Sequence, residues 1–255
     1  MTRIGTAGWT NPPAEKGRRT TESTHLHHYA ASFDCVEINS SFYRSHRQAT
    51  YARWREETPD NFAFSVKMPR RITHGCALRN CRPEIEQFLS EISGLGAKLR
   101  VILVQLPPKL SFDFGIATRF FALLSGTDAP HIALEPRHES WFSARPDELL
   151  SRSEVARVAA DPPRARNGGI PGGATYLAYY RLHGSPQTYY SRYTTAFLER
   201  QAALMRSLPA PASDAWCIFD NTARYEAWSD ALRFKDMLPC GLANRSRSER
   251  HQLST

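Results

Sequence analysis

Ionisable side chains recur at the ends of short apolar runs along this chain. Glu37, Lys67 and Glu135 stand at or near the end of such runs, and Asp161 and His183 do so further along. Carboxylate, amine and imidazole groups that share one cleft shift each other's pKa values and can exchange protons with a bound substrate. We therefore predict an acid–base site whose catalytic candidates are Glu37, Lys67, Glu135, His138, Asp161 and His183.

Arginine, amide and aromatic side chains follow the same runs. Guanidinium groups grip phosphate or carboxylate, and aromatic faces stack on bases or sugars. The predicted substrate-binding residues are Trp9, Asn39, Ser40, Tyr43, Arg70, His74, Arg137, Trp141, Arg181, Tyr190 and Asn221. In this prediction Glu135 is the first choice as acid or base, and His138 or His183 is its proton partner.

Two other interpretations of these residues stay open. In a structural one, Arg181 or Arg137 pairs with Glu37 or Glu135 and only neutralises buried charge. In a metal-binding one, the ligands for a divalent ion come from successive run ends. A change of one residue in strand parity would turn any such side chain away, so we assign no metal ligands. The metal candidates considered are Glu135, Asp161, His183 and Asp220.

Nucleophilic and dinucleotide chemistry have weaker support. Ser40 and Ser41 do not stand in a nucleophile elbow, and Cys76 and Cys81 have no identified base. The segment 5–9 reads Gly-Thr-Ala-Gly-Trp and lacks the third glycine of a dinucleotide fingerprint. We therefore expect no NAD and leave the cofactor unassigned.

The positive charge of the chain is concentrated in one segment. The formal net charge is +8, and the segment 64–82 holds Lys67, Arg70, Arg71, Arg79 and Arg82 with no acidic residue. A local excess of this kind favours binding of an anionic small molecule or nucleotide over a diffuse DNA-coating surface. The alternative is a non-catalytic protein that binds nucleic acid or a nucleotide through the basic loop 64–82.

The elements that position these residues alternate between strands and helices. Eight apolar runs predict strands at 3–7, 35–39, 62–67, 101–106, 131–135, 155–160, 176–182 and 216–220. Helical patterns lie at 25–32, 50–57, 83–95, 116–124, 146–152, 194–207 and 225–238. This order predicts an α/β protein that forms a single (β/α)8 barrel of the TIM type, in which all strand carboxyl ends open on one face.

Length and composition are those of an ordinary globular protein. The 255 residues are 41% hydrophobic and 23% charged, and no apolar run approaches the length of a membrane span. We predict one barrel domain over 1–241 and a polar, disordered tail over 242–255. Five cysteines fit neither a disulfide framework nor a zinc spacing. The first residues lack the order of a secretory signal, so we expect a cytoplasmic protein with no membrane partner.

Several ordered motifs carry a resemblance to a known family. They include Glu37-Ile38-Asn39-Ser40-Ser41-Phe42-Tyr43, Glu135-Pro136-Arg137-His138 and Arg181-Leu182-His183-Gly184. Over about residues 3–240 the chain resembles the YecE-like family, a domain of unknown function of the DUF72/UPF0759 type. The resemblance implies a (β/α)8 barrel and no particular activity. With the polar strand ends, we expect an enzyme, a hydrolase or a lyase/isomerase, that acts on a phosphorylated or other anionic substrate.

Overall fold

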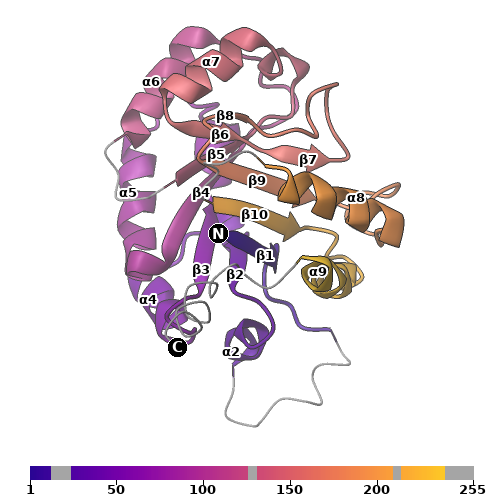
Figure 1. Ribbon diagram of the computed structural model, residues 1–255. Helices are drawn as coiled ribbons and strands as arrows, with labels where there is room; N and C mark the ends of the chain where they lie inside the picture. Colours follow the sequence, from indigo (N-terminus) through magenta and orange to yellow (C-terminus); the bar gives the residue numbers. More distant parts are fainter. Residues whose placement is uncertain (13–23, 126–130, 209–213, 239–255) are drawn as a thin grey trace, which may run out of the picture.

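The computed structural model describes residues 1–12, 24–125, 131–208 and 214–238, and strands form its centre (Figure 1). The parallel strands are short, and nearly all their residues are buried. The strands are β1 (Thr2–Thr6), β2 (Cys35–Ile38), β3 (Ala63–Lys67), β4 (Leu99–Gln105), β5 (His131–Glu135), β6 (Val155–Arg157), β7 (Ala159–Asp161), β8 (Gly172–Gly173), β9 (Leu177–Leu182) and β10 (Asp214–Phe219).

These strands form two sheets. One has the order β1-β10-β9-β7, and the other has the order β2-β3-β4-β5-β6-β8. All pairings are parallel except the one between β6 and β8. An isolated parallel bridge joins Ala7, just after β1, to Glu37 in β2. The carboxyl ends of the parallel strands therefore lie at a common edge of each sheet.

The segment 155–161 belongs to both sheets. Its first part, β6, pairs with β5, and its second part, β7, pairs with β9. Val158 separates the two parts, and its backbone N–H donates to Leu134 O at 2.8 Å. The predicted strand 155–160 is therefore interrupted at one residue where it passes from one sheet to the other.

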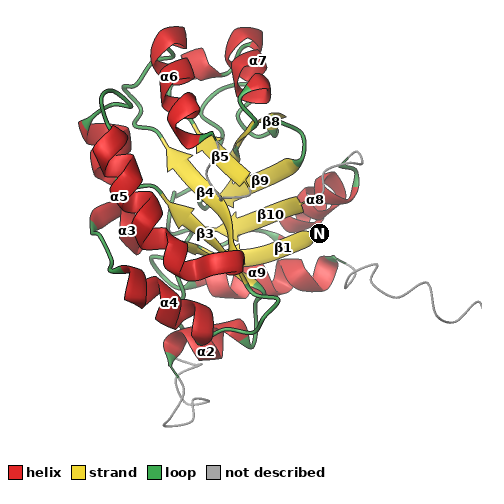
Figure 2. Cartoon of the chain, turned by 90° about the vertical axis from the view of Figure 1, so that its left-hand side faces the viewer, coloured by secondary structure: helices red, strands yellow, loops and turns green. Residues whose placement is uncertain are grey.

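Helices cover the outer faces of the strands (Figure 2). Side chains that cap the first turns fix where several of them begin. Asp113 Oδ1 accepts from Ile116 N at 2.9 Å, and Thr194 Oγ1 accepts from Phe197 N at 3.2 Å. The α-helices are α2 (His25–Ala30), α3 (Ser40–Tyr43), α4 (Gln48–Glu56), α5 (Arg82–Ile92), α6 (Phe114–Leu124), α7 (Ala144–Arg152), α8 (Thr195–Arg206) and α9 (Glu226–Met237). Helical turns of other types are η1 (Arg71–Gly75), η2 (Ser93–Lys98) and η3 (Glu139–Trp141).

Alternate residues of each strand enter two different apolar clusters. In β4, Ile102 and Val104 join the large cluster shared with the helices, whereas Val101 and Leu103 join a smaller one. The smaller cluster contains residues from both sheets, among them Cys35, Ala133, Tyr179, Trp216 and Ile218. Side chains alternate between the two faces of a strand, so residues two positions apart point to the same side. The residue that lies two positions beyond a member of the smaller cluster, toward the carboxyl end of its strand, therefore lies above that cluster.

The predicted order of strands and helices agrees with the structure, apart from details. The predicted loop 162–174 contains the two-residue strand β8. Cys35, Cys76, Cys81 and Cys217 are free thiols, and Cys240 and the predicted tail 242–255 lie outside the described residues. None of the helices in the described parts of the chain has both the length and the apolar composition needed to cross a membrane.

Candidate functional site

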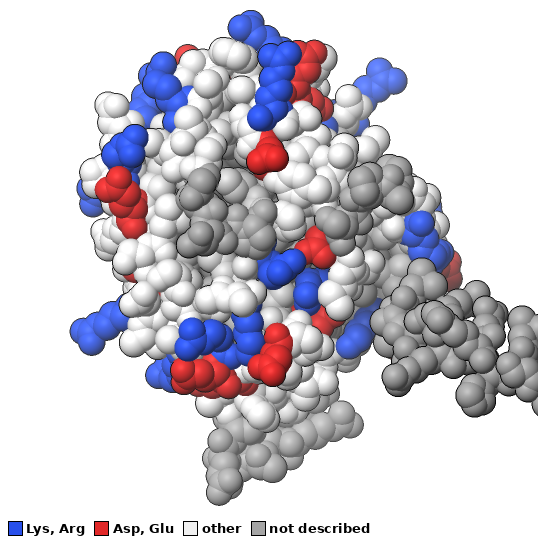
Figure 3. Space-filling view, turned by 60° about the vertical axis from the view of Figure 1, so that its left-hand side comes forward, with Lys and Arg blue, Asp and Glu red and all other residues white. Residues whose placement is uncertain are grey.

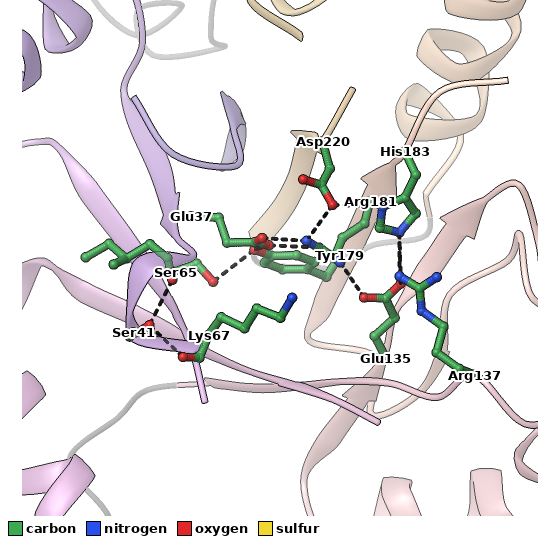
Figure 4. Close-up of polar contacts among 11 residues, drawn as sticks. Glu37, Ser41, Ser65, Lys67, Glu135, Arg137, Tyr179, Arg181, His183 and Asp220 are labelled. Carbon is green, nitrogen blue, oxygen red and sulfur yellow. Dashed lines mark hydrogen bonds and ion pairs between the residues drawn. The ribbon is translucent and has the colours of Figure 1, made fainter. Parts of the chain in front are cut away.

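A buried polar cluster lies at the carboxyl ends of the strands, with Arg181 at its centre (Figure 4). Its guanidinium donates to Glu37 through Nε at 3.0 Å and through Nη2 at 2.7 Å. It also donates to Glu135 through Nη1 at 2.5 Å and to Asp220 through Nη2 at 3.1 Å. One guanidinium therefore joins three carboxylates that come from β2, the end of β5 and the residue after β10.

Tyr179 and Ser65 support the Glu37 side of this cluster. The Tyr179 hydroxyl donates to Glu37 Oε2 at 2.8 Å and lies 2.9 Å from Ser65 Oγ. Burial, together with the nearby Glu37 carboxylate, holds the pKa of Tyr179 well above its ordinary value. Glu37 is thus fixed in place by two side chains of β9, which donate three hydrogen bonds to its carboxylate.

His183 lies between the other two carboxylates. Its Nδ1 is 2.9 Å from Asp220 Oδ2, and its Nε2 is 2.9 Å from Glu135 Oε1. Arg137 Nη2 reaches both Glu135 Oε1, at 2.7 Å, and His183 Nε2, at 3.1 Å. A neutral imidazole has one N–H and one acceptor nitrogen. Moving the proton from one ring nitrogen to the other therefore exchanges the nitrogen that donates and the nitrogen that accepts.

The pKa values of the two carboxylates follow from these contacts. Burial alone would raise the pKa of Glu135, but the charges of Arg181, Arg137 and His183 outweigh it and hold that pKa well below its ordinary value. At Asp220, too, burial alone would raise the pKa of the carboxyl group, but Arg181 and His183 outweigh burial and lower it. The lowered pKa favours the ionised form of Glu135, which pairs with its cationic neighbours, and its role as acid or base stays a prediction.

Lys67 contributes an amine to the same cluster. The side chain extends from the end of β3 toward the carboxylates (Figure 4), and its Nζ lies 4.2 Å from the centroid of the Phe42 ring. Nζ makes no hydrogen bond or ion pair with any residue in the described parts of the chain. Burial, followed by the charge of Arg181, lowers the pKa of Lys67 to about 8, although the carboxylates oppose this shift.

Solvent reaches only a few members of the cluster, and the part of the cluster that they form is called its open side below. Glu37 and Arg181 have no exposed surface, and His183 has 1%, whereas Lys67 is 8% exposed and Arg137 and Asp220 are each 9% exposed. The accessible groups are thus an amine, a guanidinium and a carboxylate. The Nε of Arg137 is buried and has no hydrogen-bond partner among the described residues.

Several predicted site residues lie outside this cluster. Asp161 accepts a hydrogen bond from the Tyr193 hydroxyl at 2.8 Å, and burial raises the pKa of its carboxyl group. His138 Nδ1 accepts from Ser140 N at 3.2 Å and so begins the turn η3. Trp141 is buried in the core, where its Nε1 donates to Leu110 O. These contacts are sufficient for a structural role, and a catalytic or binding role of the three residues stays a prediction.

Other predicted residues are also occupied elsewhere or lie at the surface. Asn221 Nδ2 donates to Ser191 O and Asp230 Oδ2, and the Trp9 ring packs edge-on against Trp54. Asn39 precedes α3 without capping it, and its buried Oδ1 has no hydrogen-bond partner among the described residues. Tyr190 is 43% exposed. None of these four side chains has a contact with the polar cluster among those described.

A separate groove lies beside the cluster, among α3, η1 and α5. It has a volume of about 630 Å³, and its lining includes Tyr43, Arg70 and His74. Phe42 joins the two regions, since its ring lines the groove and also contacts Lys67 Nζ. Ser40 lies nearby, with its Oγ 2.8 Å from His46 Nε2. Burial, followed by the charge of Arg70, lowers the pKa of His74.

The basic segment 64–82 does not form one free cationic surface. Lys67 is buried in the cluster, Arg71 pairs with Glu84 at 2.9 Å, and Arg82 lies 3.7 Å from Glu86. Arg70 and Arg79 are exposed and form no ion pair with a residue that the structure describes. Two cations of this segment therefore face solvent without a carboxylate.

The metal-binding interpretation meets an obstacle in this arrangement. Within the described ranges no group of three or more His, Cys, Asp or Glu side chains is arranged to hold a metal ion. Glu135 and Asp220 both direct a carboxylate oxygen at Arg181. The guanidinium thus stands where a cation shared by these carboxylates would bind.

Strand parity identifies the members of the cluster that sequence reasoning missed. Tyr179 lies two residues before Arg181, and Ser65 lies two residues before Lys67. Asp220, considered above only as a metal ligand, lies two residues after Ile218 of the smaller apolar cluster. Counting in steps of two residues along each strand from the smaller apolar cluster identifies all three residues. This count can be made only when the register of each strand is known.

The fold and the site define a class: an α/β protein of parallel sheets that carries a buried polar cluster at the carboxyl ends of its strands. A family model described as "Protein of unknown function DUF72" matches residues 3–252. The chain belongs to this family, which confirms the resemblance drawn from its motifs.

Similar proteins include two named members of the UPF0759 group. UPF0759 protein YecE of Escherichia coli (strain K12) is 36% identical over 167 residues, which are 63% of this chain and 59% of YecE. The chain thus matches less than two thirds of the length of YecE. UPF0759 protein YunF of Bacillus subtilis (strain 168) is 25% identical and is aligned over 96% of this chain and 98% of its own length.

Solved structures of the family have the same fold. A DUF72 family protein from Enterococcus faecalis V583 superposes with a TM-score of 0.80 at 20% identity, covering 94% of this chain and 96% of that one. A DUF72 family protein from Thermotoga maritima MSB8 has a TM-score of 0.75 at 23% identity, covering 93% and 98%. At these identities the likeness concerns the fold alone.

Proposed function

We propose that this protein is an enzyme that binds an anionic small molecule at the open side of the polar cluster and acts on it by acid–base chemistry. The observation that carries the proposal is Lys67, a buried amine that has no hydrogen-bond or ion-pair partner among the described residues and lies beside three carboxylates. A desolvated amine with a pKa of about 8 can act as a base near neutral pH. Burying such a group without a partner costs stability, which favours a functional role.

The proposal also includes the architecture that holds the cluster. We infer that the two sheets are parts of one closed (β/α)8 barrel in a single domain. In support, the bridge from Ala7 to Glu37 joins β1 to β2, and the segment 155–161 pairs with β5 on one side and β9 on the other. The smaller apolar cluster then fills the barrel interior, and the polar cluster closes its carboxyl-terminal end.

Each member of the cluster has a role in this proposal. Lys67 is the base that takes a proton from the substrate, and His183, oriented by Asp220, is the acid that returns one. Arg137 binds the anionic group, because it is 9% exposed, whereas the other guanidinium of the cluster, that of Arg181, has no exposed surface. Glu37 and Glu135 hold Arg181 and are positioning residues. A lyase or isomerase needs such a pair of proton carriers.

Nucleic-acid binding through the loop 64–82 has less support. Three of the five basic residues there are buried or lie near carboxylates, which leaves Arg70 and Arg79 as its exposed, unpaired cations among the described residues. On the face drawn in Figure 3, basic side chains lie beside acidic ones. A protein that binds nucleic acid chiefly through phosphates needs more uncompensated cations on one surface.

The test is a screen for conversion of phosphorylated and carboxylated small molecules, followed by nuclear magnetic resonance. The variants are the full-length protein, Lys67→Met and the control Lys109→Met, in which an exposed lysine is replaced. We expect a conversion that falls by at least about 100-fold in Lys67→Met, since positioned proton transfer contributes factors of this size. Lys109→Met should retain the wild-type rate.

The alternative function gives a different result. It predicts no converted molecule, together with binding of single-stranded nucleic acid that weakens steeply with salt. In that case Arg70→Ala and Arg79→Ala would flatten the salt dependence, and Lys67→Met would not. That outcome would overturn the enzyme proposal.

A further inference from the structure

Two partly or fully buried lysines have opposite surroundings. Lys98 Nζ donates to Arg55 O at 2.7 Å and to Thr58 O at 2.6 Å, and so it is fixed at the end of α4. Lys67 Nζ instead lies against the face of the Phe42 ring and has no hydrogen-bond acceptor among the described residues. The Lys67 lone pair therefore becomes available once the proton leaves, and no carboxylate must be displaced first.

The carboxylates near Lys67 are committed to other groups. Glu37 accepts from Arg181 and Tyr179, Glu135 accepts from Arg181 and Arg137, and Asp220 contacts Arg181 and His183. Three carboxylates face two guanidiniums, so with a neutral imidazole the cluster lacks one positive charge unless Lys67 carries it. The three carboxylates thus favour a cation at the Lys67 nitrogen, whereas burial and Arg181 oppose it, and no contact fixes this cation as an ammonium.

An iminium ion is the other cation that this nitrogen can carry. We propose that Lys67 forms a covalent imine with the carbonyl carbon of an aldehyde or ketone that also bears a phosphate or carboxylate group. This inference rests on the proposed function and names its substrate class. Desolvated lysines beside cationic groups are suited to this reaction.

The step conserves atoms and charge. The neutral amine attacks the carbonyl carbon, and the attacking nitrogen passes one of its protons to the carbonyl oxygen to give a neutral carbinolamine. The carbinolamine hydroxyl then accepts a proton from the His183 imidazolium and leaves as water, and the nitrogen lone pair forms the C=N bond. The positive charge moves from the imidazole to the iminium nitrogen, where the three carboxylates stabilise it. The anionic group of the substrate lies against Arg137.

Reductive trapping tests this inference. The full chain is treated with sodium borohydride in the presence of glyoxylate or dihydroxyacetone phosphate and measured by intact mass and peptide mass spectrometry. We expect one adduct per chain on the Lys67 peptide at pH 7, formed at least ten times faster than adducts on the exposed Lys109 and Lys235. Acetone, which lacks the anionic group, should label Lys67 more slowly, and inorganic phosphate should slow the labelling by both anionic probes.

Variants separate this inference from the proposed function. Lys67→Arg keeps the charge but cannot form an imine, so it should lose the adduct, whereas Lys109→Arg should keep it. Labelling of Lys67 no faster than that of Lys109 would overturn the imine. If a conversion that needs Lys67 is found but borohydride does not inactivate it, the acid–base proposal stands and the imine does not. If no conversion depends on Lys67 and no adduct forms there, both are wrong.

Discussion

At the scale of single residues, the surroundings of Lys67 disfavour the protonated form of its amine. Burial lowers the pKa of this amine to about 8, so roughly one in ten molecules is neutral at pH 7, against about one in three thousand for an ordinary lysine. The unfolded chain therefore binds more protons than the folded chain between about pH 8 and 10.5, and this residue makes folding more favourable as the pH rises through that window.

This linkage predicts that Lys67→Met does not weaken the fold at pH 7. The substitution removes a buried amine without a bonded partner and keeps its apolar stem, so we expect an equal or higher free energy of unfolding. Lys98→Met should lower it by about 1–3 kcal/mol, because two backbone carbonyls lose a charged donor. Urea denaturation of both variants checks this pair, and a larger loss for Lys67→Met would contradict the assigned role.

The surroundings of Arg181, unlike those of Lys67, favour the charged form of the side chain, because buried carboxylates contact its guanidinium. We expect Arg181→Met to lower the free energy of unfolding by about 3–5 kcal/mol, because Glu37 and Glu135 would stay buried without their main partner. The control is Arg119→Met, which replaces an exposed arginine and should change stability by less than about 0.5 kcal/mol. If urea denaturation gives the same unfolding midpoint for Arg181→Met and Arg119→Met, Arg181 does not hold the cluster together.

At the scale of elements, the contact between β1 and β2 decides whether the sheets join. A side chain added at Gly5 would place Cβ 2.3 Å from Cys35 O, so the strands approach too closely for any residue but glycine. We expect Gly5→Ala to destabilise the fold by at least about 2 kcal/mol through backbone displacement.

A matched glycine in a helix provides the control for Gly5. At Gly115, in α6, an added Cβ would meet only the ends of the Arg119 and Asp113 side chains at 3.4 Å or more. Gly115→Ala should therefore stabilise the protein by up to about 1 kcal/mol through helix propensity. Thermal unfolding of both variants is the measurement, and tolerance of Gly5→Ala would contradict the close β1–β2 approach.

The order of elements could be predicted from the sequence because each strand is a continuous apolar run between turn residues and helical patterns. The interruption at Val158 could not, because no glycine or proline marks a break in the run 155–160 and only pairing with two different sheets separates its two parts. The direction of a side chain just beyond the end of a strand is harder still to predict. Trp141 follows β5 by six residues, yet the turn η3 directs its ring into the core.

The candidate site could be predicted in part for the same reason. Glu37, Lys67, Glu135, Arg181 and His183 stand at strand ends and converge in the structure. Their pairing could not be predicted, since the choice among Arg181, Arg137 and either glutamate depends on register and on distances between strands remote in sequence. In the proposed function Glu135, the first-choice acid or base of the sequence prediction, is a positioning residue, and Lys67, another catalytic candidate, is the base.

At the scale of the whole molecule, acid should destabilise the protein through the buried carboxylates. The pKa values of Glu135 and Asp220 are lower in the folded protein than their ordinary values of 4.5 and 3.8, so the unfolded chain binds more protons in that range. Their contribution is complete above about pH 5 and is lost as the pH falls toward the folded pKa values. Urea midpoints between pH 7 and pH 3 should fall steeply, and Glu135→Gln should flatten the decline.

The account depends most directly on the state of the Lys67 amine in the intact protein. The chain has five lysines, so a nuclear magnetic resonance titration of their Cε and Nζ signals can be assigned with Lys67→Arg as the reference. We predict that one signal titrates near pH 8, that it is absent in Lys67→Arg, and that inorganic phosphate at the open side raises its midpoint. Titration of Lys67 above pH 10 would contradict the proposal that this cluster is a reaction site.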